Sequence, residues 1–146
     1  MSDADLQLAT SRLIDAPRDE VLAAFRDPVR LARWWGPDGF RNTFEEFDFR
    51  PGGRWRFVMH GPDGGDYRNE SVFTAAGPET VVVDHQSPPR FRLTIALDEE
   101  APGRTRVGWM QRFPTREERD RIAKFAVAAN EQNLDRLAAE VARRDS

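Results

Sequence analysis

Turn-forming residues interrupt the middle of this chain at short, regular intervals, and this spacing constrains the fold more than any other feature. The clusters of proline and glycine lie at residues 51–53, 61–65, 77–79, 87–89 and 101–103. The runs between them are about 8 to 12 residues long, which is typical of an antiparallel meander of short strands. Apolar and polar residues alternate from Phe91 to Leu97 and from Thr105 to Phe113. We therefore expect a sheet with one covered face and one wet face.

Helical patterns occupy the rest of the sequence. After a first strand at residues 6–14, Pro17-Arg18-Asp19-Glu20 opens a short helix. Asp27-Pro28 ends it and starts a second helix, which ends near Trp35-Gly36-Pro37. The last segment is much longer, because Thr115-Arg116-Glu117-Glu118 reads as a capping box followed by an apolar stripe.

The final helix is expected to run from about Arg116 to Arg143, on the order of 40 Å at 1.5 Å per residue. Its predicted buried stripe comprises Ile122, Phe125, Ala129, Asn133, Leu137 and Val141, flanked by Ala126 and Leu134. A curved sheet with one apolar face needs such a cover. The sequence thus predicts an α+β fold over residues 1–146 as one domain. It consists of about seven antiparallel strands wrapped around a long C-terminal helix, with two short helices after the first strand.

Composition excludes several function classes. The chain has no cysteine, which removes disulfides and thiolate chemistry. Its 22 basic and 25 acidic residues give a net charge of −3, so we expect no nucleic-acid partner. No apolar run approaches the roughly 20 residues of a membrane span, and residues 1–5 lack the basic start of a signal peptide. We expect a cytoplasmic protein that does not insert into membranes.

Side chains for metal or acid–base chemistry are few. Only His60 and His85 could act as bases at neutral pH, and alternation places them on opposite faces of the sheet. We therefore predict no metal site and no cofactor. The same alternation places Glu45 and Glu46 on opposite faces, which disfavours a paired-carboxylate hydrolase.

Large aromatic residues concentrate between residues 32 and 59, which hold three of the four tryptophans. Trp55, Phe57 and Met59 share one strand face, and Trp109 lies on the inner face of the last strand. These side chains either fill the core or wall an apolar pocket.

Polar residues interrupt several faces that are otherwise apolar: Asn69, Ser71, His85, Gln111 and Asn133, with Asn130 at the flank of the helical stripe. A buried amide without a partner costs about 1–3 kcal/mol. Each therefore has a protein partner, a water molecule or a ligand. Our hypothesis is that Asn69, Ser71, His85, Gln111 and Asn133 surround one polar spot in an apolar pocket.

A family resemblance rests on several motifs taken in order. They are Ala16-Pro17, Trp34-Trp35-Gly36-Pro37, residues 48–53, residues 54–59, Gly103-Arg104-Thr105 and Gln111-Arg112-Phe113. With these motifs the chain resembles bacterial single-domain proteins related to the activator of the heat-shock-protein-90 ATPase. That family lies in the START-like, or SRPBCC, helix-grip superfamily. The resemblance implies a sheet that grips the last helix around a cavity, which holds apolar ligands in many relatives. Such relatives often have Gly-Trp where this chain has Ala129-Asn130, and glycine where it has Ser71.

The first function hypothesis is the binding of a small hydrophobic or lipid-like ligand between the sheet and the last helix. Its expected walls are Trp35, Trp55, Phe57, Met59, Phe73, Trp109, Phe125 and Ala129, and its polar lining is Asn69, Ser71, His85, Gln111, Asn130 and Asn133. The alternatives are a co-chaperone-like interaction protein and a cyclase or hydrolase of the same superfamily. The enzyme would need His85 beside an acid or a hydroxyl such as Ser71, and we name no catalytic residue. A contact with a chaperone and a homodimer stay open.

Overall fold

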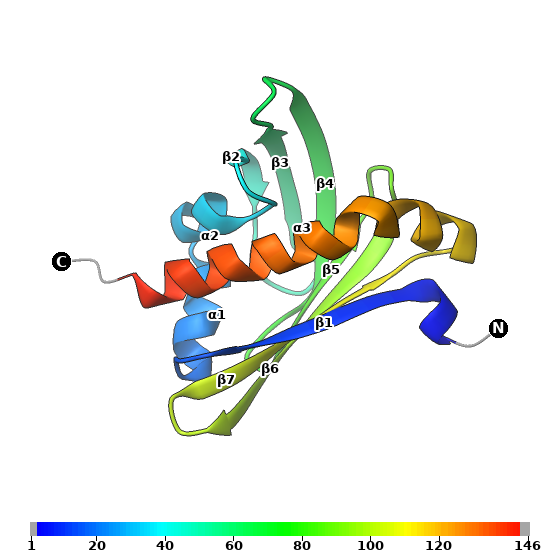
Figure 1. The fold of residues 1–146 in the computed structure, drawn as a ribbon. Coiled ribbons are helices and arrows are strands. Elements are labelled where there is room, and N and C mark those ends of the chain that lie inside the picture. Colours follow the sequence, from blue (N-terminus) through cyan, green and yellow to red (C-terminus); the bar gives the residue numbers. More distant parts are fainter. Residues whose placement is uncertain (1–2, 144–146) are drawn as a thin grey trace.

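Seven strands form one antiparallel sheet, and a long helix lies across it (Figure 1). The computed structural model describes residues 3–143. In chain order its elements are η1 (Asp3–Leu6), β1 (Gln7–Ile14), α1 (Arg18–Arg26), α2 (Pro28–Trp34), β2 (Arg41–Phe47), β3 (Arg54–His60), β4 (Asp66–Ala76), β5 (Thr80–His85), β6 (Phe91–Ala101), β7 (Arg104–Arg112) and α3 (Arg116–Ala142). The predicted α+β architecture is confirmed, including the two short helices after the first strand.

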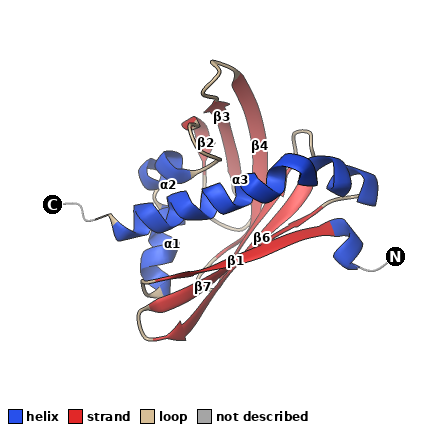
Figure 2. Cartoon of the chain, viewed as in Figure 1, coloured by secondary structure: helices blue, strands red, loops and turns tan. Residues whose placement is uncertain are grey.

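The strand order is β1-β7-β6-β5-β4-β3-β2. The first strand pairs with the last one, from Gln7 opposite Arg112 to Ile14 opposite Thr105, while β2 to β7 follow one another as a meander. Figure 2 shows α3 crossing one face of this sheet, with α1 and α2 near its C-terminal end. We call the face toward α3 the inner face.

Side-chain caps define where two of the helices begin. Thr115 accepts a hydrogen bond from the Glu118 backbone N–H at 3.2 Å, which confirms the predicted N-cap of α3. Asp27 caps α2 in the same way, through the Val29 N–H at 3.0 Å. Among residues 3–143, no helix combines the length and the apolarity needed to cross a membrane.

Irregular pairing bends three of the strands. Register shifts lie between Phe44 and Glu46, between Phe73 and Ala75, and between Glu99 and Ala101. A bulge adds one residue to a strand and increases its local twist. The first shift also corrects a prediction: Glu45 and Glu46 do not point to opposite faces, since both carboxylates reach Arg56, at 3.8 and 3.5 Å.

The buried face of α3 differs in part from the predicted stripe. Its buried residues are Ile122, Ala126, Asn133, Leu134, Leu137 and Glu140. Phe125 is 65% exposed, so its placement in the buried stripe was wrong. The reason is that the first half of α3 leans toward the β1 edge, where Ile122 and Ala126 pack on Phe113 and Leu8. This packing turns Phe125 away from the core.

Candidate functional site

Aromatic rings from four elements meet on the inner face. Trp35, the C-cap residue that follows α2, contacts two strand tryptophans, with its ring centroid 4.9 Å from Trp55 and 5.7 Å from Trp109. The Trp55 ring also stacks on Phe57 at 4.4 Å and on Phe73 at 5.5 Å. Trp55, Phe57, Phe73 and Trp109 are buried, and Trp35 is half-buried. The helix end and the sheet are thus joined by aromatic contacts.

Three buried polar atoms in this region have no hydrogen-bond partner among the described residues. They are Nε1 of Trp55, Oγ of Ser71 and Nε1 of Trp109. Trp34 differs from these two tryptophans, because its Nε1 donates to the Ala24 carbonyl at 2.9 Å. An unsatisfied buried donor costs about 1–3 kcal/mol. The inner face therefore carries polar groups that can bind a partner from outside the chain.

His85 and Asn69 form a polar pair beside these atoms. Nε2 of His85 lies 2.6 Å from Oδ1 of Asn69, and Nδ1 lies 2.8 Å from the Pro89 carbonyl oxygen. The imidazole also stacks on Phe91, with centroids 4.6 Å apart. Burial lowers the pKa of His85 below its ordinary value, and the carbonyl groups of Pro89 and Ser87 oppose this shift. Burial thus favours the neutral form of the ring, which can donate through only one of its two nitrogens.

An open pocket of about 540 Å³ begins at this pair. It is lined by Phe40, Met59, Asp66, Tyr67, Arg68, Asn69, His85, Pro88 and Pro89, and we call it the mouth pocket. Its apolar residues come from the loop before β2, the β3–β4 hairpin and the β5–β6 loop. Ser71 follows Asn69 by two residues on β4 and lies directly opposite both Trp55 and His85 in the sheet. Ser71 itself does not line the pocket, but it is buried and is the cross-strand neighbour of His85, which does.

The other predicted polar residues occupy two further places. Asn130 donates to Gln111 at 2.8 Å. Asn133 instead binds the backbone that follows α2. Its side chain donates to the Trp34 carbonyl at 3.1 Å and accepts from the Gly36 N–H at 3.3 Å. The five residues predicted to surround one spot are therefore divided. Asn69, Ser71 and His85 lie together, whereas Gln111 and Asn133 each have a protein partner elsewhere.

The predicted wall residues also differ in their exposure. Met59 lines the mouth pocket and Ala129 is half-buried, but the Phe125 side chain lies largely in solvent and does not wall an enclosed space. Six lining residues were not predicted: Phe40, Asp66, Tyr67, Arg68, Pro88 and Pro89. Alternation with Asn69 pointed to Tyr67, whereas Phe40 reaches the pocket through a loop that carries no periodic signal.

The contact between His85 and Ser71 that the enzyme alternative would need is not among the hydrogen bonds of the described residues. Both ring nitrogens of His85 have partners other than Ser71. His60 lies on the outer face as predicted, where it contacts Thr43 and Asp66 at 2.7 Å each. Within residues 3–143, no group of three or more His, Cys, Asp or Glu side chains could hold a metal ion. The side chains that line the pocket offer apolar contact, hydrogen bonds and the charges of Asp66 and Arg68.

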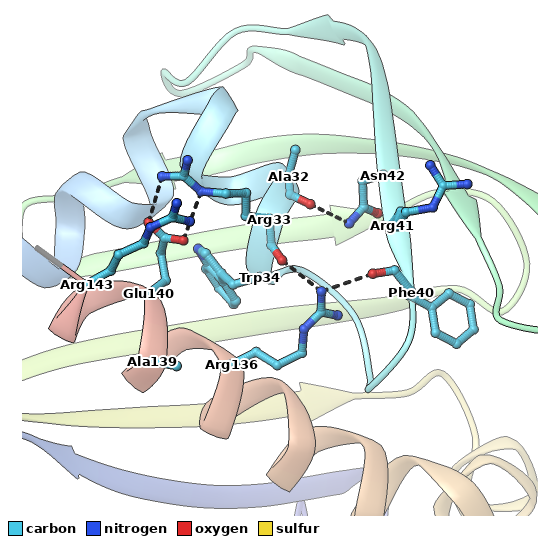
Figure 3. Close-up of a pocket in the computed structure, with 10 residues that line it drawn as sticks. All are labelled: Ala32, Arg33, Trp34, Phe40, Arg41, Asn42, Arg136, Ala139, Glu140 and Arg143. Carbon is cyan, nitrogen blue, oxygen red and sulfur yellow. Dashed lines mark hydrogen bonds and ion pairs between the residues drawn. The ribbon is translucent and has the colours of Figure 1, made fainter. Parts of the chain in front are cut away.

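A second pocket, of about 650 Å³, lies between α2, the start of β2 and the C-terminal half of α3 (Figure 3). At one end of it, Glu140 is 6% exposed and accepts hydrogen bonds from Arg30 and from both Nε and Nη2 of Arg33. Burial by itself raises the pKa of Glu140, but the two guanidinium groups outweigh it and the net shift is downward.

Arg136 in this pocket anchors the segment that carries the tryptophans. It donates to the backbone carbonyls of Arg33, Trp35, Gly36, Pro37 and Phe40, at 2.7 to 3.2 Å. Together with Asn133 it fixes the course of residues 33–40. These polar contacts explain how Trp35 and Phe40, which come from a loop, are held against the sheet.

Comparison with known proteins shows the family to which this chain belongs. The family model described as "Activator of Hsp90 ATPase homolog 1-like protein" matches residues 15–142. The chain belongs to this family. Among curated proteins, none matches its sequence significantly.

Solved structures of this family type share the whole fold. A protein from Arthrobacter aurescens is 25% identical, with a TM-score of 0.87, over 100% of this chain and 91% of that one. A protein from Nitrosomonas europaea is 20% identical, with a TM-score of 0.85, over 97% of each chain. The AHSA1 protein from Silicibacter pomeroyi is 21% identical, with a TM-score of 0.73, over 93% of this chain and 97% of that one. Family and neighbours support a helix-grip fold of the ligand-binding type.

Proposed function

We propose that this protein binds a small apolar or lipid-like molecule that enters through the mouth pocket and reaches the inner face beside Ser71. The observation that carries the proposal is an open, mostly apolar pocket whose lining residue His85 is the cross-strand partner of Ser71, a buried hydroxyl without a hydrogen-bond partner. Binding sites for small molecules typically combine apolar walls with a few polar groups that orient the ligand.

The residues have distinct roles in this proposal. Phe40, Met59 and Tyr67 supply apolar contact, and methionine adapts to irregular shapes. The His85–Asn69 pair offers a polar contact at the entrance. A ligand that covers these side chains gains roughly 25 cal/mol for each Å² of apolar surface removed from water.

A titration with an apolar fluorescent probe, 1-anilinonaphthalene-8-sulfonate, tests the proposal, and native mass spectrometry of the freshly purified protein looks for a retained ligand. The decisive variants are neighbours on β3 that point to opposite faces. Met59→Gln should weaken probe binding about tenfold, since it replaces a thioether in the pocket wall by an amide. Val58→Gln, on the outer face and equally half-buried, should leave it unchanged. A protein that carries no ligand and does not change probe fluorescence would contradict the proposal.

A further inference from the structure

Most of the buried polar atoms without a partner on the inner face can donate a hydrogen bond. Of the four such atoms among the described residues, two are indole N–H groups, which can only donate, and one is the Ser71 hydroxyl, which can donate or accept. The fourth, Oδ1 of Asn42, is an acceptor at the start of β2, opposite Met59. A single group that satisfies Ser71 and the two indoles must be a hydrogen-bond acceptor.

The positions of these donors allow one ligand to meet more than one of them. Ser71 and Trp55 are direct cross-strand partners on the same face of the sheet. Side chains at such positions start about 5 Å apart at their Cβ atoms. Trp109 lies on the other side of the Trp35 ring, which contacts both strand tryptophans. A planar ligand that displaced the Trp35 ring would therefore lie close to donors on β3, β4 and β7.

The charge of the surroundings decides what kind of acceptor fits. Among residues 3–143, the buried polar or charged side chains are Ser71, Thr105, Gln111, Asn133 and Glu140, and none of them is a cation. The one buried carboxylate belongs to the ion pairs with Arg30 and Arg33 described above. Burial also lowers the pKa of His85 and so disfavours a positive charge on this ring. A carboxylate or phosphate at this depth would lose its hydration without gaining a counter-charge.

We infer that the ligand buries a neutral hydrogen-bond acceptor, a carbonyl oxygen on a planar apolar body, against Ser71 and Trp55, with Trp109 as a further donor. This inference rests on the proposed function and specifies the chemistry of its ligand. The aromatic walls favour a flat molecule, since rings stack with offset or edge-to-face geometry. The donors are already removed from water in the free protein. A hydrogen bond from the ligand to them therefore forms without a further desolvation cost for the donors.

Three naphthalenes of nearly equal size test the inference, because they differ only at one substituent. 2-Acetylnaphthalene carries a neutral carbonyl, 2-ethylnaphthalene carries no acceptor, and 2-naphthoate carries a charged one. Affinities are measured by tryptophan fluorescence quenching at pH 7.5. We expect the ketone to bind about tenfold tighter than the ethyl compound, and the carboxylate to bind most weakly.

Two variants assign the effect to the hydroxyl. Ser71→Ala should weaken the ketone about threefold to tenfold, the range expected for one hydrogen bond, and leave the ethyl compound unchanged. Thr74→Ala removes an exposed hydroxyl from the same strand and should change neither. Equal binding of all three compounds, or tightest binding of 2-naphthoate, would overturn the inference and leave the proposed function standing. If none of the three binds, the proposed function itself fails.

Discussion

Nε2 of His85 lies 2.6 Å from Oδ1 of Asn69, which joins β5 to β4 through side chains at the entrance of the mouth pocket. The two residues stand out separately in the sequence, as polar side chains on apolar strand faces. In the structure they are partners. Ser71, which shares their face, is left as the unpartnered member of the group.

The first prediction concerns the titration of His85. Its pKa should lie below the ordinary histidine value, because burial outweighs the carbonyl groups of Pro89 and Ser87. The folded-state pKa is the lower one, so the unfolded chain binds more protons between the two values. Stability therefore falls as the pH drops below about 6.5. NMR titration of the imidazole measures this pKa.

The variant Asn69→Asp tests the contact between His85 and residue 69 by placing a negative charge there. It places a carboxylate 2.6 Å from the ring nitrogen and should raise the pKa of His85 relative to the wild type. An unchanged imidazole titration in this variant would show that the pair does not form in solution.

The second prediction concerns acid stability through Glu140. Its folded-state pKa is lowered, so the stabilisation is present above the unfolded value and is lost as the pH falls through the folded one. Glu140→Gln should lower the free energy of unfolding by about 2 kcal/mol at pH 7. This loss is smaller than that expected for a fully buried ion pair, because Arg30 and Arg33 are 22% and 35% exposed. Urea unfolding at pH 7 and pH 3.5 measures this, and the difference between variant and wild type should shrink at the lower pH.

The third prediction concerns the anchor of residues 33–40. Arg136→Lys keeps the charge but replaces a planar donor group that reaches five carbonyls by a single ammonium. It should destabilise the protein by about 1–3 kcal/mol. Amide hydrogen exchange should rise at Phe40 more than in β6. A uniform rise over the whole sheet would argue against a local anchor.

The fourth prediction concerns Ser71 in the absence of ligand. Removing a buried hydroxyl that has no partner relieves an unsatisfied group, so Ser71→Ala should raise the free energy of unfolding by about 1 kcal/mol. Thermal unfolding of the ligand-free protein measures it. A loss of stability would mean that the hydroxyl already has a partner, such as a bound water.

The fifth prediction tests the start of α3. Thr115→Ala removes the side-chain acceptor of the Glu118 N–H and should cost about 1 kcal/mol. Thr115→Ser retains the hydroxyl and should cost much less. Equal losses in the two variants would assign the effect to the methyl group instead of the cap.

The sequence alone determined the element order, the alternation of the strands and the start of α3. These features depend on neighbouring residues: a turn needs proline or glycine at a given place, and Thr115 caps an N–H three residues away. The family motifs are of the same local kind. The opposite facing of His60 and His85 also follows from strand alternation.

Only the tertiary structure decided which side chains meet. The bulge at Phe44–Glu46 brings Glu45 and Glu46 to one arginine, because one added residue reverses the alternation that the sequence predicts. The tilt of α3 exposes Phe125, and the anchored loop carries Phe40 to the pocket. Local sequence spacing does not predict hydrogen bonds between residues on different elements, such as the one between Asn130 and Gln111. Periodicity fixes the face of an element on which a residue lies, but the packing of that element sets which partner it finds there.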